Sequence, residues 1–200
     1  MARPRTFDED RVLEQAMRAF WLHGYEGTST RDLCEATGLD RSSVYNAFTS
    51  KHELFRRALT RYTEAMTATQ TEILEDGDRP AIERIRALFA KIIDDEFTFR
   101  GDAPSIGCLG VNTTVEFGGR DPEIARLLEQ DAARRLETLR AAVEAGRRDG
   151  DIRSPRDPAA LARYLNAVTA GIRVAAQGGA DRAVLEAIAE TALDAVTATA

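Results

Sequence analysis

The stretch of residues 28–54, TSTRDLCEATGLDRSSVYNAFTSKHEL, constrains the fold of this chain more than any other. It holds three helix-start signals in close succession, at Ser29, Asp40 and Ser50. Gly38 lies between the first two, where glycine can end a helix in the left-handed conformation at little cost. Val44 and Phe48 are four residues apart and share a helix face. The pattern predicts two short helices across a tight turn, followed by a long third helix.

The outward face of the helix expected over residues 41–48 is polar and small. The residues that we expect on it are Arg41, Ser42, Ser43, Tyr45, Asn46 and Ala47. Small residues allow close approach to a major groove, and Arg and Asn side chains can read base edges. The region is therefore either a DNA-binding helix-turn-helix or a helical hairpin with a polar outer face.

The same region resembles a known family. The resemblance is carried by Gly24-Tyr25-Glu26-Gly27-Thr28-Ser29, Leu33, Ala36, Gly38, Val44-Tyr45, Phe48, Ser50-Lys51 and Leu54-Phe55. Over roughly residues 8–62, the chain is similar to the N-terminal domain of TetR/AcrR-type transcriptional regulators. The resemblance implies a homodimeric regulator of palindromic double-stranded DNA, in most cases a repressor that a small-molecule effector releases.

Helical periodicity continues through the rest of the chain and predicts an all-α fold of about nine helices. Besides the two short helices, we expect helices over residues 7–23, 51–75, 81–99, 122–148, 158–177 and 181–197, and one more that begins near Cys108 in the apolar, glycine-broken stretch of residues 105–119. We expect a three-helix DNA-binding domain over residues 1–62 and an effector-binding and dimerisation domain over residues 63–200. The boundary falls inside the helix that begins at Lys51.

The charge balance supports this division. The 200 residues carry a net charge of −6, but residues 1–62 alone hold ten Lys or Arg and nine Asp or Glu, a net +1. The acidic residues therefore lie mostly outside the helix-turn-helix. Phosphate binding must depend on where individual charges are placed rather than on an overall basic domain.

The sequence contains no motif that is typical of an enzyme, a metal site or a cofactor site. Cys34 and Cys108 are far apart and give neither a disulfide framework nor a zinc-binding spacing, and His23 and His52 are isolated. We find no phosphate-binding glycine loop and no nucleophile elbow, so we expect no enzymatic activity, no metal and no cofactor. The charged N-terminus and the lack of about 20 consecutive apolar residues predict a cytoplasmic protein without a membrane partner.

The resemblance assigns DNA contacts residue by residue. Thr28 and Ser29 correspond to phosphate donors at a helix start, and Tyr45 and Lys51 to a phosphate-binding tyrosine and lysine. The base-facing positions hold Arg41, Ser42, Ser43 and Asn46. Ser42 and Asn46 depart from the glycine and histidine that are frequent there, which leaves the operator sequence open.

The N-terminal arm MARPRT could add further contacts. Arg3 and Arg5 flank Pro4, which resists helix formation. Such an arm either frays in solution or lies along phosphates or in the minor groove, as homeodomain arms do. Arg3 and Arg5 are therefore candidate DNA contacts.

The C-terminal part offers two ways of sensing a signal. A small-molecule pocket is expected from a mixture of apolar and polar residues that would equally suit a plain core: Phe89, Ile93, Phe97, Cys108, Val111, Asn112, Val115 and Glu116. Alternatively, Cys108 itself senses electrophiles or oxidants, because it precedes an expected helix and the positive end of a helix stabilises a thiolate. Some members of the family carry a sensing cysteine in this domain. A packed core cysteine is the other interpretation.

The last two helices are rich in alanine and glycine, which let helices approach closely. The resemblance implies that they form a four-helix dimer interface with a second copy, whereas packing within one chain is the alternative. The expected interface residues are Leu161, Leu165, Val168, Ile172, Leu185, Ile188 and Ala192. A dimer would also present two recognition helices to the two halves of a palindrome.

Overall fold

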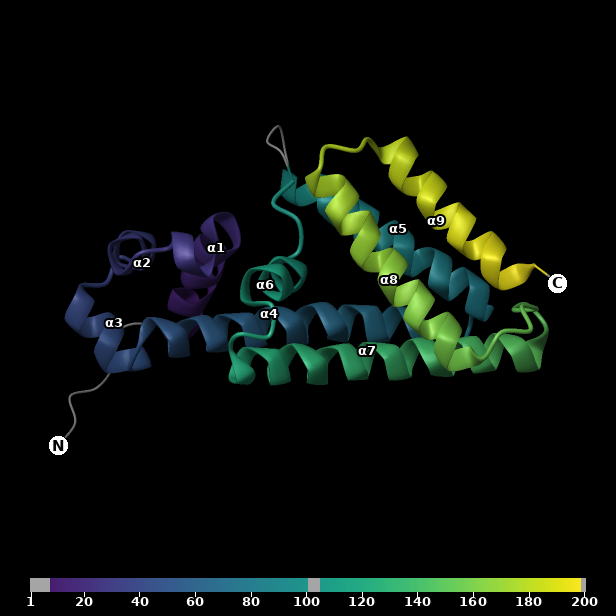
Figure 1. Cartoon of the computed structure of the whole chain (residues 1–200), viewed down its shortest axis with the longest axis horizontal. Helices are drawn as coiled ribbons and strands as arrows, with labels where there is room; N and C mark the ends of the chain where they lie inside the picture. The colour runs from purple at the N-terminus through teal and green to yellow at the C-terminus, as the bar shows by residue number, and fades with distance from the viewer. Residues whose placement is uncertain (1–7, 101–104, 199–200) are drawn as a thin grey trace. The chain divides into compact units, whose positions relative to one another are not determined.

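The computed structural model describes residues 8–100 and 105–198, and within them the chain forms helices and connecting loops without any strand (Figure 1). The helices are α1 (Glu9–Gly27), α2 (Thr30–Thr37), α3 (Arg41–Phe48), α4 (Lys51–Leu74), α5 (Ala81–Arg100), α6 (Leu109–Phe117), α7 (Pro122–Asp149), α8 (Pro158–Gln177) and α9 (Arg182–Thr197). The predicted all-α fold with about nine helices is thereby confirmed for the described part of the chain.

The helices form two compact units. The first unit contains the chain up to Glu64 together with Leu109–Leu128, and the second contains Ala65–Cys108 together with Glu129–Ala200. The helices α4 and α7 each contribute one end to the first unit and the other end to the second. The first unit thus includes α6, which lies well beyond residue 62 in the sequence.

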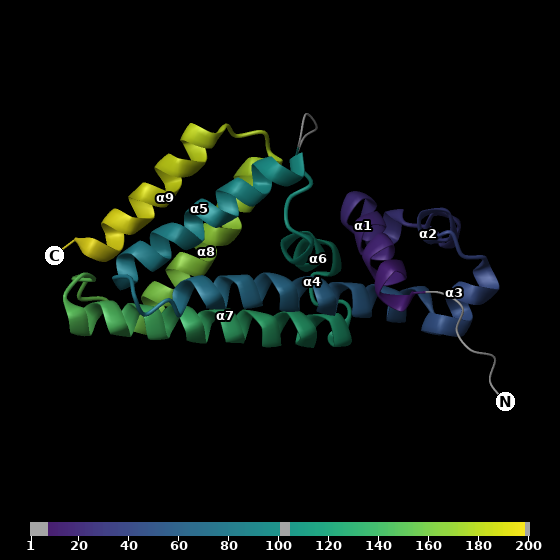
Figure 2. The same ribbon diagram turned by 180° about the vertical axis from the view of Figure 1, so that it is seen from behind.

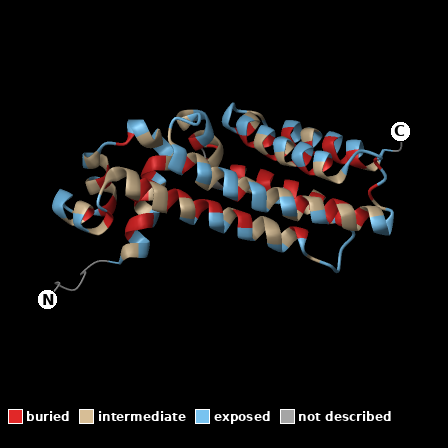
Figure 3. Ribbon diagram, turned by 60° about the horizontal axis from the view of Figure 1, so that its bottom comes forward, coloured by how far each residue is buried: buried red, intermediate tan, exposed pale blue. Residues whose placement is uncertain are grey.

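The first unit has an aromatic core. Apolar residues of α1 at helical spacing are buried, as their periodicity predicts, and they meet buried side chains of α2, α3 and α4. The largest side chains that are at most 1% exposed in this unit are Phe20, Leu33, Phe48, Leu54, Phe55, Leu59 and Ile124. Buried positions alternate with exposed ones around each helix, as the colouring of Figure 3 shows.

The second unit has an aliphatic core in which α5, α8 and α9 lie side by side in both views of Figures 1 and 2. Leucine and isoleucine stripes at helical spacing face one another across these helices. Residues of this core that are at most 2% exposed include Ile85, Leu88, Ile92, Leu165, Ile172, Leu185 and Leu193. Packing of this kind stabilises long amphipathic helices that would be marginal in isolation.

The second unit also buries charged groups. Arg173 on α8 lies 3.6 Å from the Glu96 carboxylate on α5, and each residue is only 4% exposed. The Ser105 hydroxyl donates to the other Glu96 carboxylate oxygen at 2.6 Å. Asp131 on α7 accepts a hydrogen bond from Thr67 at 2.7 Å and pairs with Arg135. The attraction between paired charges offsets part of the desolvation cost of burying each of them.

Candidate nucleic-acid interface

The helix-turn-helix is built from hydrogen bonds between residues close in sequence. Ser29 caps α2, and it forms a reciprocal capping box with Asp32. Gly38 ends α2 in the left-handed conformation, with φ of 69°. Asp40 then caps α3 by accepting the Ser43 N–H at 2.7 Å, and the Ser50 hydroxyl accepts the Glu53 N–H in the first turn of α4. The predicted helix starts and the predicted turn are therefore confirmed.

The helix α3 exposes the residues that were predicted to face bases. Arg41, Ser42 and Asn46 are exposed, and Ser43 is half-buried, whereas Val44 and Phe48 are each 1% exposed and anchor the opposite face in the core. The Ser42 hydroxyl donates to Asp40 at 2.7 Å. The polar face of α3 is consequently displayed from a helix whose orientation is fixed on its apolar side.

Tyr45 connects α3 to α2. Its hydroxyl lies 3.1 Å from the Thr30 hydroxyl, within hydrogen-bond distance, and the Arg41 guanidinium lies 5.6 Å from the centre of its ring. The hydrogen bond with Thr30 holds the pKa of Tyr45 below its ordinary value, and the positive charge of Arg41 acts in the same direction. Tyr45 thus places its hydroxyl between α2 and α3, where the resemblance expects a phosphate contact.

The two residues predicted as phosphate donors at the start of α2 differ. Ser29 is exposed, and its hydroxyl accepts the Asp32 N–H at 3.2 Å. Thr28 is 0% exposed, and its hydroxyl donates to the Gly24 carbonyl at 2.6 Å. A phosphate contact through the Thr28 side chain is contradicted by this burial, because the hydroxyl is covered and already bonded inside the protein. The Thr28 side chain instead joins the end of α1 to the start of α2.

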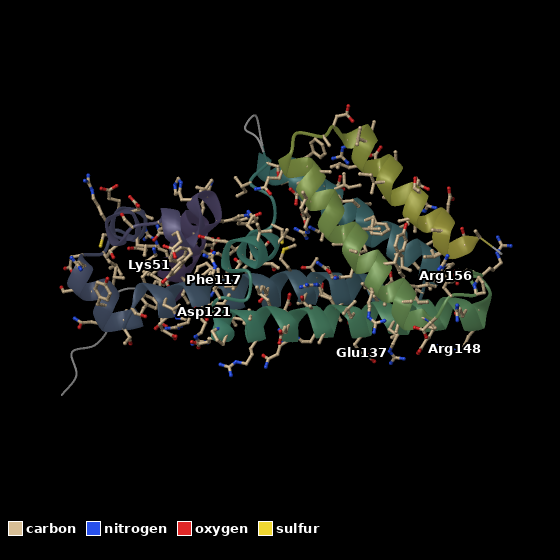
Figure 4. The ribbon with its side chains drawn as sticks, in the orientation of Figure 1. Lys51, Phe117, Asp121, Glu137, Arg148 and Arg156 are labelled. Carbon is tan, nitrogen blue, oxygen red and sulfur yellow. The ribbon has the colours of Figure 1, made fainter. Side chains whose placement is uncertain are left out.

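Lys51 begins α4, and its ammonium nitrogen lies 4.2 Å from the centre of the Tyr25 ring (Figure 4). A cation at this distance over an aromatic face is attracted by the quadrupole of the ring. Tyr25 packs against Phe55 at 5.0 Å and Phe117 at 5.3 Å between ring centres. The predicted phosphate-binding lysine is therefore held above an aromatic cluster shared by α1, α4 and α6.

Glu116 on α6 contacts the backbone of α1 next to this cluster. Its carboxylate oxygens accept the N–H groups of Tyr25 at 3.0 Å and of Glu26 at 2.8 Å. These two N–H groups follow Gly24, whose backbone leaves the helical conformation with φ of 74°. Glu116, one of the predicted effector-pocket residues, thus binds backbone N–H groups within the first unit.

His52 and Asp121 form a second link between α4 and the start of α7. His52 Nε2 lies 2.6 Å from an Asp121 carboxylate oxygen, and Asp121 also accepts the N–H groups of Glu123 and Ile124. Burial acts to raise the pKa of Asp121, but the Ile124 N–H, His52 and the Glu123 N–H together hold it below its usual range. Periodicity could not indicate this pair or the Glu116 contact, because each joins residues far apart in the sequence.

The predicted pocket residues are divided between the two units. Phe89 and Ile93 belong to the buried core of the second unit, where Phe97 is half-buried and Cys108 is also half-buried. In the first unit, Val111 and Asn112 are half-buried on α6. Val115 is 79% exposed, which contradicts its assignment as a pocket-lining residue.

The predicted dimer residues are largely interior. Five of them are at most 2% exposed within a single chain: Leu161, Leu165, Ile172, Leu185 and Ala192. Within one chain their side chains fill the core between α5, α8 and α9, which leaves little of their surface for a second copy. Val168 and Ile188 are only partly buried at the edge of this core and remain candidates. Helical periodicity identified the apolar face of each helix correctly, but it could not say which surface covers that face.

Three further predictions concern absences or the N-terminal arm. Arg3 and Arg5 lie outside the residues that the structure describes. Over residues 8–100 and 105–198, no group of three or more His, Cys, Asp or Glu side chains is arranged to hold a metal ion. Within the same residues, no helix combines the length and the apolar character needed to cross a bilayer.

Comparison with known protein families assigns both parts of the chain. Residues 12–58 match the family described as bacterial regulatory proteins, tetR family. Residues 81–192 match the tetracyclin repressor-like C-terminal domain. The HTH-type transcriptional repressor ComR of Escherichia coli K12 is 35% identical over 191 residues, which cover 96% of this chain and 90% of ComR. YezE of Bacillus subtilis, an uncharacterized HTH-type transcriptional regulator, is 32% identical and aligns with 83% of this chain and 84% of its own.

Solved structures agree with this assignment. A cysteine mutant of the TetR family regulator CifR, in complex with 26-base-pair operator DNA, superposes with a TM-score of 0.83 at 32% identity and covers 98% of this chain and 100% of its own. The reduced form of NemR from E. coli has a TM-score of 0.84 over 96% of this chain and 98% of its own, but at 21% identity it supports the fold alone.

Proposed function

Because the chain belongs to the TetR family of bacterial transcriptional regulators, we propose that it is a homodimeric repressor that acts in the cytoplasm on a palindromic double-stranded DNA operator. A small-molecule effector releases it from this operator. Members of the family are regulators and generally not enzymes. Residues 1–62 carry DNA binding in this proposal, and residues 63–200 carry effector binding and dimerisation.

The exposed face of α3 is the observation that carries the DNA-binding part. Arg41, Ser42 and Asn46 are displayed from a helix whose apolar face is anchored in the core. Three further groups are suited to phosphates: the Tyr45 hydroxyl on α3, Ser29 at the start of α2 and Lys51 at the start of α4. Phosphate contacts would fix the position of the unit on the duplex, and the α3 side chains would read base edges. The operator complex of CifR supports the same mode of binding.

A second copy of the chain would bind through the outer faces of α8 and α9. One exposed stripe on α8 runs through Tyr164, Ala167, Gly171 and Val174, at the three- and four-residue spacing of a helix face. Val184 on α9 is 48% exposed, and Val174 on α8 is 53% exposed. Small residues between such apolar side chains allow two copies to pack closely, and the dimer would supply the second recognition helix for a palindrome.

Dimerisation is tested by Val174→Arg, with Val115→Arg as the matched control, because Val115 is an even more exposed valine in the first unit. We expect Val174→Arg to give a monomer by size-exclusion chromatography with light scattering, since a buried unpaired charge opposes association. The control should remain a dimer. A dimeric Val174→Arg protein would rule out this surface.

Effector release requires a ligand that binds two states of the protein unequally, since equal affinity shifts no population. We propose that the ligand-bound state no longer matches the spacing of the operator half-sites. Among the predicted pocket residues of the second unit, Phe97 and Cys108 retain some exposed surface.

The alternative signal is chemical modification of Cys108. This residue is half-buried and directly precedes α6. Two solved complexes of CifR with operator DNA carry substitutions at cysteines. In this alternative, an electrophile or oxidant attached to Cys108 would disturb the start of α6.

One experiment separates these possibilities. Binding is measured to DNA upstream of the protein's own gene and its neighbours, over a salt series, with and without a thiol-reactive electrophile. Tight, salt-dependent binding is expected of the wild-type protein, and Lys51→Ala should weaken it with a shallower salt dependence.

Release by the electrophile that is lost in Cys108→Ser would identify Cys108 as the sensor, whereas binding that the electrophile leaves unchanged would favour a reversible ligand. Absence of salt-dependent binding to these fragments and to a random-sequence pool would contradict DNA binding.

A further inference from the structure

We propose that Tyr25 is a positioning residue for the phosphate contact of Lys51, and that α6 holds Tyr25 in place through Glu116 and Phe117. This inference rests on the proposed DNA-binding function. It makes α6 part of the DNA-binding device, although α6 is far from α3 and α4 in the sequence.

The Lys51 side chain must be ordered before its ammonium group can contact a phosphate. A lysine side chain has a flexible four-carbon stem, and ordering it at a phosphate costs conformational entropy. In this protein the Lys51 ammonium already lies 4.2 Å from the centre of the Tyr25 ring. The ring occupies one side of the ammonium group. The ammonium group has three N–H donors, so it can still donate hydrogen bonds to a phosphate on the other side. The ring therefore reduces the freedom that Lys51 loses when DNA binds.

Glu116 on α6 holds the backbone of Tyr25. Gly24 interrupts α1 with φ of 74°, so the next N–H groups begin a new helical turn without acceptors of their own. The Glu116 carboxylate accepts two of these N–H groups, those of Tyr25 and Glu26. A Cβ atom at Gly24 would lie only 3.1 Å from Glu116 Oε2. Glycine is thus required both for the backbone conformation and for the approach of this carboxylate.

Phe117 on α6 and Phe55 on α4 hold the ring of Tyr25. Phe117 is 5.3 Å from the Tyr25 ring and stacks on Phe55 at 5.4 Å with an interplanar angle of 13°. The two phenylalanines contact Tyr25 from α6 and α4, and they limit its rotation. Burial raises the pKa of Tyr25, and the carboxylates of Glu26, Asp121 and Glu116 raise it further, which keeps the phenol neutral. Through these contacts, a displacement of α6 would release Tyr25 and loosen Lys51 without altering the surface of α3.

The test of Tyr25 compares Tyr25→Phe, Tyr25→Leu, Lys51→Ala and the Tyr25→Leu/Lys51→Ala double variant. Affinity for a fluorescein-labelled mixed-sequence duplex of about 30 base pairs is measured over a salt series, because phosphate contacts are independent of sequence. We expect Lys51→Ala to lower the salt slope by about 0.9 for each phosphate that the lysine neutralises in the wild type. Tyr25→Leu should weaken binding about two- to fivefold and lower the slope in the same direction. Tyr25→Phe should bind like the wild type.

The double variant decides between positioning and a purely structural role. If Tyr25 acts through Lys51, adding Tyr25→Leu to Lys51→Ala should change affinity by less than about twofold. An equal loss in both backgrounds, with an unchanged salt slope, would overturn the inference while leaving DNA binding intact. A wild-type protein that does not bind the duplex at all would instead contradict the proposed function.

The contribution of α6 is tested by Glu116→Gln, with Glu64→Gln as the matched control at an exposed position of α4. A glutamine can accept one of the two N–H groups but presents an amide N–H₂ to the other. Without any DNA, the Lys51 ε-CH₂ protons of the wild type should show an upfield ring-current shift in NMR spectra. We expect this shift to shrink in Glu116→Gln and to persist in Glu64→Gln. Its absence from the wild type, or its persistence in Glu116→Gln, would overturn the inference.

Discussion

The helix-capping carboxylates Asp32 and Asp40 of the first unit and the buried Glu96 of the second unit are stabilised in different ways. In the first unit, Asp32 and Asp40 are at helix starts in contact with water and accept hydrogen bonds from residues two or three positions along the chain. In the second unit, Glu96 is 4% exposed and lies against Arg173, a residue of another helix. The first arrangement is local, and the second exists only after the helices have packed.

This difference reverses the direction of the pKa shifts. The Ser29 hydroxyl and N–H lower the pKa of Asp32, and the Ser42 hydroxyl with the Ser43 N–H lowers that of Asp40. Burial raises the pKa of Glu96, and it outweighs the opposing effects of Ser105 and Arg173. Hydrogen bonds to a carboxylate favour its charged form, whereas removal from water disfavours it. Asp40 and Glu96 should consequently make contributions to stability that change in opposite directions as pH falls.

The largest expected effect is that of breaking the buried pair. Arg173→Met would leave Glu96 in the core without its counter-charge, which should lower the unfolding free energy by about 3–5 kcal/mol. The matched control is Arg163→Met, at an exposed position of the same helix, where we expect little change. Urea unfolding followed by far-UV circular dichroism measures both variants.

Glu96→Gln should restore part of the stability lost in Arg173→Met, because it removes the unpaired charge. Equal stability of Arg173→Met and Arg163→Met would show that the pair contributes nothing. Fluorescence of Trp21, the single tryptophan, reports separately on the first unit, where its ring packs 4.9 Å from that of Tyr62.

The next effect concerns the glycine that admits Glu116. Gly24→Ala forces a side chain into a positive-φ conformation, which costs roughly 1–2 kcal/mol, and it also crowds the Glu116 carboxylate. Gly27→Ala is the matched control, since a Cβ atom there meets only His23 Cβ at an ordinary 3.8 Å. Trp21 fluorescence in urea should show destabilisation for Gly24→Ala alone. Similar behaviour of both variants would contradict the role assigned to Gly24.

A smaller effect is the pH dependence of the second unit. With a raised pKa in the folded state, Glu96 binds more protons when folded than when unfolded. Stability should therefore fall as pH rises from about 4.3, the value for an unfolded glutamate, through the higher folded pKa. Glu96→Gln does not ionise and should lack this loss. Parallel stability curves of the two proteins across this range would contradict the raised pKa.

The smallest effect is the opposite dependence in the first unit. The lowered pKa of Asp40 gives stability that is present above about pH 3.9, the value for an unfolded aspartate, and is lost as pH falls through the folded pKa. Asp40→Asn keeps a capping oxygen but cannot ionise. The stability difference between wild type and Asp40→Asn, followed by Trp21 fluorescence, should vanish in acid. A difference that does not change with pH would show that the charge of Asp40 is not involved.

The sequence by itself determined the helices, the helix starts and the turn of the helix-turn-helix, and the exposed polar face of α3, but it placed the end of α1 at residue 23, whereas α1 continues past a kink at Gly24 to Gly27. These features depend on hydrogen bonds and side-chain spacing within a few residues, as at Ser29, Gly38 and Asp40. The family resemblance of residues 8–62 could be recognised for the same reason, because its motifs are short and contiguous.

Only the tertiary structure decided which surface covers each apolar face and what each distant polar group binds. Leu161 and Leu185 have the periodicity of interface residues, yet they fill the core of one chain. Glu116 could have served a ligand, but it accepts two N–H groups near the end of α1. Periodicity predicts which face of a helix is buried. It carries no information about which helix, or which copy of the chain, covers that face.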